Sequence, residues 1–128
     1  MPVPLEEPIW LCTSRIPCSY VLDHGKSLCF FPEGIRSSNG EIGKFKKGFG
    51  ILAKETGAQL VPVAIEGAHE AWSSTEQYPK CHPIRVRFGK PLFPEDLEKE
   101  GLACGAQDPY DAICVAARRA LVELKDKK

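Results

Sequence analysis

The sequence predicts an α/β fold with a mainly parallel sheet and flanking helices. Two short apolar runs, residues 27–31 and 60–65, have the length and composition of buried strands. An amphipathic helix lies between them, and a strand–helix–strand unit is expected to cross over right-handed with parallel strands. The 128 residues suffice for one domain, and 43% hydrophobic with 27% charged residues is ordinary globular composition.

The first three elements each have local signals. Gly25 and Pro32 bound the run at 27–31, as is typical of a central strand. Pro62 removes a backbone donor from the run at 60–65, which predicts a bulge or an edge there. The intervening helix is predicted by one apolar face and by Gly57 at its C-terminal cap. The residues of that face are Phe45, Phe49, Leu52, Ala53 and Thr56.

The second half of the chain predicts one more strand and two helices. After a polar excursion over residues 66–83, apolar residues alternate with arginines over 84–88, which predicts a half-buried strand with a charged outer face. Residues 94–100 predict a short helical turn. Asp108-Pro109 is a typical helix start, followed by an apolar stripe that reaches the C-terminus. That stripe comprises Tyr110, Ile113, Cys114, Ala117, Leu121 and Leu124.

Composition excludes several classes of protein. Seventeen basic and seventeen acidic residues give no net charge, so nucleic acid is not an expected partner. No apolar stretch approaches the roughly 18 residues of a membrane span. The six cysteines contain no Cys-x-x-Cys pair, and Cys29 and Cys114 sit in apolar surroundings as small buried residues do. A reduced, cytoplasmic protein is expected.

The segment after the first predicted strand is the candidate site, because ligands bind beyond the carboxyl ends of strands in open α/β sheets. Arg36 offers five donors in a fork that suits phosphate. Gly34 permits close backbone approach, and Ser37 adds a neutral donor. Glu33 can accept from a hydroxyl or orient Arg36. These residues alone leave two readings open, an anion-binding loop and an ordinary exposed turn.

Residues 31–37 read FPEGIRS, which resembles the Phe-Pro-Glu-Gly-Thr-Arg-Ser block of the glycerolipid acyltransferases, the lysophosphatidate acyltransferase family. Three later segments are similar to family blocks and follow in the same order. They are Lys46-Lys47-Gly48-Phe49, Val61-Pro62-Val63 and Phe88-Gly89-Lys90-Pro91-Leu92. The resemblance runs from about Gly25 to Leu97, and Ile35 replaces the usual Thr.

This resemblance implies a 1-acylglycerol-3-phosphate O-acyltransferase-like activity in phospholipid biosynthesis. An acyl group would pass from acyl-coenzyme A or acyl carrier protein to a lysophospholipid hydroxyl, with no metal and no cofactor beyond that co-substrate. The substrate-binding residues implied are Glu33, Gly34, Arg36, Ser37, Lys47, Pro62 and Val63.

The catalytic His-x-x-x-x-Asp block of the family is absent from the sequence. Five residues after His24, His69 and His82 stand Cys29, Ser74 and Arg87. A hydroxyl of high pKa needs such a base as it attacks a thioester. We therefore expect an incomplete acyltransferase-type domain, with an irregular lead-in at 1–19 and a partial domain at 20–128. No catalytic residue is assigned, and the chain alone is expected to be inactive.

Two further functions remain open, a non-catalytic module that binds phospholipid headgroups or other anions and a small nucleotide-binding domain. Residues 36–54 hold five basic residues and one acidic residue, so peripheral association with a membrane surface is expected through Lys44, Lys46 and Lys47. An incomplete sheet exposes a strand edge and part of its core. Self-association, or pairing with a missing N-terminal half, is therefore expected.

Overall fold

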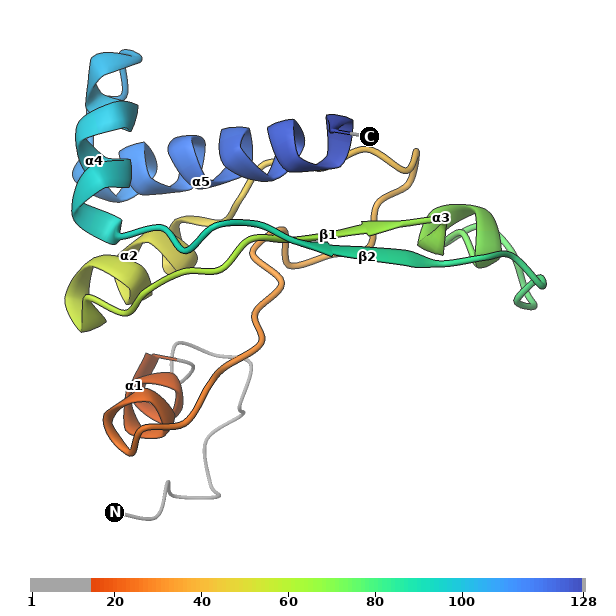
Figure 1. Cartoon of the computed structure of the whole chain (residues 1–128), viewed down its shortest axis with the longest axis horizontal. Coiled ribbons are helices and arrows are strands. Elements are labelled where there is room, and N and C mark those ends of the chain that lie inside the picture. The colour runs from red at the N-terminus through yellow and green to blue at the C-terminus, as the bar shows by residue number, and fades with distance from the viewer. Residues whose placement is uncertain (1–14, 128) are drawn as a thin grey trace.

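The computed structural model describes residues 15–127 as five helices and two strands around one small core (Figure 1). In chain order these are α1 (Arg15–Asp23), α2 (Lys47–Thr56), β1 (Val63–Glu66), α3 (Ala68–Ala71), β2 (Arg85–Phe88), α4 (Pro94–Ala103) and α5 (Pro109–Asp126). Helices α4 and α5 pack against each other and α2 packs against α5, and α1 lies below this body, in contact with α2 (Figure 1). No helix in residues 15–127 has the length and apolar character needed to cross a membrane.

The three packed helices confirm the helical predictions. Helix α2 ends at Gly57, whose φ of 64° is the left-handed cap that the sequence predicts. Helix α4 extends three residues beyond the predicted turn at 94–100. At the start of α5, the Asp108 carboxylate accepts from the Tyr110 backbone N–H at 3.0 Å.

The core lies where these helices meet. Its buried members are Phe45, Ala53, Leu97, Ile113, Cys114, Ala116 and Ala117. Small residues on α5 allow close approach of its neighbours. Cys114 is buried as predicted, its thiol donates to the Lys46 carbonyl at 3.3 Å, and burial raises the pKa of that thiol.

The predicted mainly parallel sheet is not confirmed. Within residues 15–127, strands β1 and β2 form a two-stranded antiparallel sheet, with Val63 opposite Phe88 and Glu66 opposite Arg85. An isolated antiparallel bridge between Leu60 and Leu92 extends the pairing. Pro62 lies between the bridge and the strand, as its missing N–H requires.

The predicted strand at 27–31 is wrong. These residues form no ladder, since no strand within residues 15–127 pairs with them, and Leu28, Phe30 and Phe31 are exposed. The parallel β-α-β unit is therefore absent from the described part of the chain. Cys29, in the same run, is also exposed and not buried as predicted.

The burial pattern of β2 differs from the predicted one, although Arg85 is exposed as predicted. Val86 and Phe88 are exposed, Phe88 by 73%, whereas Arg87 is partly buried and pairs with Glu66. The reason is that the face carrying Ala64 and Arg87 turns toward α5, and Ala64 is only 2% exposed. The other face, with Val63 and Ile65 of β1, lacks a covering layer among the described residues.

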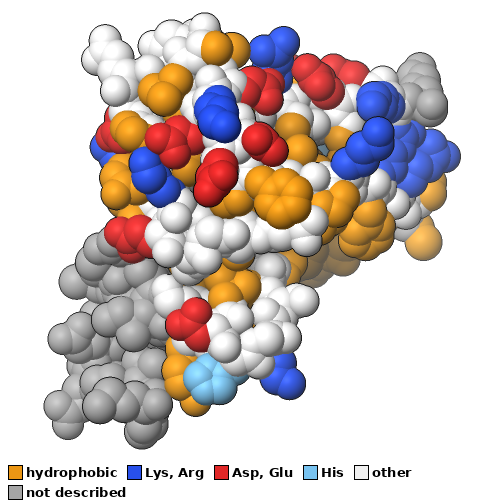
Figure 2. All heavy atoms as spheres, turned by 60° about the vertical axis from the view of Figure 1, so that its left-hand side comes forward, with side chains coloured by type: hydrophobic (Ala, Val, Ile, Leu, Met, Phe, Trp, Pro, Cys, Tyr) orange, Lys and Arg blue, Asp and Glu red, His pale blue; other side chains and the backbone are white. Residues whose placement is uncertain are grey.

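Helix α1 covers the last five residues of the segment predicted as an irregular lead-in, so residues 15–19 are helical. Residues 1–14 lie outside the described residues, and the division at residue 19 stays a prediction. Acidic and basic side chains are interspersed over the face formed by α2 and α4, in keeping with the zero net charge (Figure 2).

Candidate functional site

The FPEGIRS motif opens a loop of residues 31–43 that the fold holds at both ends. Gly34 has a φ of 75° and donates its N–H to Phe31, which makes the tight turn at Pro32-Glu33. The Lys46 side chain lies within 3.3 Å of where a Gly34 Cβ would be. The Lys46 N–H also donates to the Pro32 carbonyl at 2.7 Å. The glycine thus keeps the loop close to the start of α2.

The Glu33 side chain forms a hydrogen bond within this loop. Its carboxylate accepts from the Gly43 backbone N–H at 2.8 Å, which joins the two ends of the loop. The Ser37 hydroxyl donates to the Glu41 carbonyl at 2.8 Å and lies 3.2 Å from the Asn39 amide oxygen. Both predicted polar groups therefore shape the loop.

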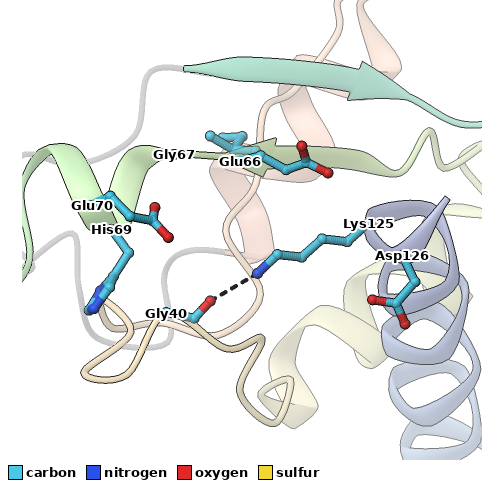
Figure 3. A pocket seen from close by; sticks show the side chains of 8 residues that line it. Gly40, Glu66, Gly67, His69, Glu70, Lys125 and Asp126 are labelled. Atoms are coloured by element: carbon cyan, nitrogen blue, oxygen red, sulfur yellow. Dashed lines mark hydrogen bonds between the residues drawn. The ribbon is translucent and has the colours of Figure 1, made fainter. Parts of the chain in front are cut away.

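Helix α5 anchors the same loop from outside. The Arg118 guanidinium donates to the carbonyls of Ile42 and Gly43, at 2.8 Å and 3.1 Å. The Lys125 ammonium donates to the Gly40 carbonyl at 2.9 Å (Figure 3). This role of α5 was not predicted, because contacts across more than 70 residues have no local signal in the sequence.

Arg36 is the loop residue that is available to a ligand. Its guanidinium donates to the Trp72 carbonyl and lies 5.3 Å from the centre of the Trp72 ring. The Trp72 indole N–H is itself fixed, because it donates to the Glu76 carbonyl at 3.1 Å. No carboxylate within residues 15–127 pairs with Arg36, and the residue is exposed. Trp72 is not among the predicted site residues, because a contact between positions 36 residues apart has no local signal.

The remaining predicted site residues lie elsewhere. Lys47 forms an ion pair with Asp108, the cap of α5, and this contact raises the pKa of the Lys47 ammonium. Pro62 accepts from the Gly89 N–H at 2.8 Å, and Val63 pairs with Phe88. These two residues stand at the start of β1, whereas Trp72 follows its far end. The predicted cluster thus divides into a loop group and a sheet group.

Two hollows adjoin the loop on different sides of α3. One, of about 230 Å³, is lined by His69, Glu66, Glu70, Gly40, Lys125 and others (Figure 3). His69 projects from α3 toward Gly40, with its ring 3.1 Å from where a Cβ on that glycine would be. The other, of about 600 Å³, includes Arg36 and Trp72. His69 and Arg36 therefore line different hollows.

Comparison with known proteins connects this arrangement to one family. Residues 14–66 match the family model described as Acyltransferase. A 1-acyl-sn-glycerol-3-phosphate acyltransferase of Cocos nucifera is 38% identical over 80 residues, which are 62% of this chain and 26% of that protein. A chloroplastic enzyme of the same name from Arabidopsis thaliana is 31% identical over 116 residues, 90% of this chain and 28% of that protein.

A solved structure shows the same fold. The 1-acyl-sn-glycerophosphate (LPA) acyltransferase PlsC from Thermotoga maritima superimposes with a TM-score of 0.65 and 22% identity. The match covers 89% of this chain and 45% of that one. The chain spans about a quarter of the length of the curated relatives that it matches.

Proposed function

The chain belongs to the glycerolipid acyltransferase family, and from that premise we propose that its 31–43 loop binds the phosphate of a glycerol phosphate acceptor. The relatives are named 1-acyl-sn-glycerol-3-phosphate acyltransferases, which belong to phospholipid biosynthesis. The observation that carries the proposal is Arg36. Its guanidinium is oriented by Trp72, and no acidic side chain within residues 15–127 neutralises it.

The full reaction would join this acceptor to an acyl group from acyl-coenzyme A or acyl carrier protein. The attacking hydroxyl must lose its proton, and a histidine oriented by an aspartate is suited to accept it. None of the three histidines is followed at the fifth position by aspartate. We therefore propose that the chain binds acceptor but does not transfer acyl groups by itself.

Calorimetry with glycerol 3-phosphate tests the binding proposal. Arg36→Ala removes a charge-assisted hydrogen bond worth about 1.5–3 kcal/mol, so affinity is expected to fall about ten- to hundred-fold. Arg119→Ala is the matched control, because this exposed α5 arginine pairs with Glu123 away from the loop. Equal affinity of the wild-type and Arg36→Ala proteins would remove Arg36 from the site.

Radiolabelled acyl transfer from acyl-coenzyme A to lysophosphatidate tests the second proposal. No labelled phosphatidate is expected from the purified chain. A labelled product that disappears in Arg36→Ala would mean that another residue serves as the base. His69→Gln would then be the first variant to make, since His69 lies against the loop at Gly40.

The alternative function is a non-catalytic module that binds phospholipid headgroups. The exposed Lys44 and Lys46 favour it, because both lie beside the loop and attract anionic surfaces. Sedimentation with vesicles containing phosphatidate distinguishes this from binding of the soluble acceptor. Peripheral membrane binding predicts salt-sensitive co-sedimentation that weakens in a Lys44→Ala, Lys46→Ala double variant.

A further inference from the structure

The hollow beside Arg36 has an apolar lining. We call it the Arg36 groove. Its apolar residues are Ala68, Ala71, Trp72, Pro79, Cys81 and Ile84, contributed by α3 and by the segment that leads into β2. At about 600 Å³ it lies within the range of pockets that hold small ligands. Ala68, Trp72 and Ile84 are exposed there, so the described residues leave apolar surface uncovered.

The charged residues that line the groove are all basic. Arg36 and Lys80 are cationic, and no carboxylate is among its lining residues in the described part of the chain. Lys80 is already paired with Glu76 at 2.7 Å, which leaves Arg36 as the cation available to a ligand. The Nδ1 atom of His82 is 2.9 Å from the Pro83 carbonyl, so this ring nitrogen is turned to the backbone. The groove thus combines an apolar wall with one guanidinium that pairs with no carboxylate within residues 15–127.

This combination fits a single amphiphile that carries an anionic head and an apolar tail. A free phosphate would use Arg36 and leave the apolar residues exposed to water. A neutral lipid would cover those residues and leave the guanidinium without an anion. Only a ligand with both parts satisfies the polar and the apolar groups together.

We propose that the Arg36 groove receives the acyl chain of the lysophospholipid acceptor while Arg36 binds its phosphate. This inference rests on the proposed function, because it assumes that the acceptor phosphate meets Arg36. Trp72 then serves both parts of the ligand, since it orients the guanidinium and also lines the groove. In this assignment, Ile84 and Ala68 contact only the acyl chain of the ligand.

Calorimetry with a series of soluble acceptors tests the assignment. Glycerol 3-phosphate is compared with butanoyl-, hexanoyl- and octanoyl-lysophosphatidate, each below its micelle concentration. A fully buried methylene tightens binding about four-fold, so octanoyl-lysophosphatidate is expected to bind at least ten-fold more tightly than glycerol 3-phosphate.

Two variants localise this gain to the groove. Ile84→Asn makes its wall polar, and Ala68→Phe fills it at an exposed helix position; both are expected to abolish the dependence on chain length. Affinity for glycerol 3-phosphate should stay within two-fold of wild type. Val86→Asn is the matched control, because Val86 is an exposed residue of the neighbouring strand outside both hollows. Circular dichroism melting verifies that all variants are folded.

The outcomes separate this inference from the proposed function. Absence of glycerol 3-phosphate binding to wild type would contradict the proposed function itself. Binding with no dependence on chain length, or a dependence that survives both groove variants, would overturn the groove assignment alone. If the octanoyl chain tightened the binding of octanoyl-coenzyme A but not of lysophosphatidate, the groove would belong to the acyl donor. That result would also overturn the groove assignment.

Discussion

Arg36 and Lys47 are both basic residues of family blocks, yet the fold sends their side chains in different directions. Arg36 meets Trp72, a residue 36 positions later, whereas Lys47 pairs with Asp108 at the start of α5. The family motifs identify a set of candidate site residues. Which of them share a site depends on which distant partners they meet, and the residue types alone carry no information on that.

Asp108 caps the start of α5 and also forms an ion pair with Lys47. Both contacts affect the titration of its carboxyl, which can be measured. The Lys47 ammonium, and then the Tyr110 N–H, hold the pKa of this carboxyl below its ordinary value of about 3.9. A carboxyl with a depressed pKa stabilises the fold at pH above its unfolded pKa. That contribution is lost as the pH falls through the lower folded pKa.

The Asp108→Asn variant keeps an acceptor for the cap and loses the charge. At pH 7 it is expected to be less stable than wild type, and the difference should disappear as the pH falls through the lowered folded-state pKa of Asp108. Urea denaturation at a series of pH values measures this. A double-mutant cycle with Lys47→Met isolates the pair. Parallel pH profiles of wild type and Asp108→Asn would contradict the assignment.

The elements of this molecule pack closely where glycines face α5. A Cβ on Gly50 of α2 would lie 2.2 Å from the Tyr110 carbonyl oxygen, and one on Gly101 of α4 would lie 2.1 Å from that of Ala112. Backbone atoms cannot yield as a flexible side chain can. These glycines therefore set the distances of α2 and α4 from α5.

Gly50→Ala is expected to destabilise the protein by about 2–3 kcal/mol, because the helices must separate. Gly48→Ala is the matched control on the same helix, since a Cβ there meets nothing within 4 Å. Its expected effect is neutral or stabilising by up to about 1 kcal/mol. Chemical denaturation compares the two variants, and equal stabilities would contradict the close-packing argument.

At the scale of the whole molecule, the sheet has one covered and one uncovered face. Ala64 and Arg87 face α5, while Val63, Ile65, Val86 and Phe88 are exposed on the opposite face. Exposed apolar faces and strand edges favour association. Self-association stays a prediction, which sedimentation can test.

Sedimentation velocity is expected to show a sedimentation coefficient that rises with protein concentration. Phe88→Lys should shift the equilibrium toward monomer, because it places a charge in the apolar face. Tyr78→Lys is the control, since Tyr78 is equally exposed, 72% against 73%, but lies outside the sheet. A concentration-independent monomer in wild type would refute the expectation.

Signals within a few residues of one another predicted much of this protein. The apolar periodicity predicted α2 and α5, the Asp108-Pro109 pair predicted the start of α5, and Gly57 predicted the end of α2. The ordered motifs identified the acyltransferase family. Each of these signals is local because backbone hydrogen bonds in a helix and consecutive residues in a motif are themselves local.

Tertiary structure alone decided the rest. Whether residues 27–31 form a strand depends on a neighbouring strand, and β1 instead pairs antiparallel with β2. The alternation in 84–88 predicts a strand but not which face meets α5. Trp72 joins Arg36, and Arg118 holds the loop, through contacts between distant parts of the chain. Strand pairing and site assembly are non-local, so only the folded chain determines them.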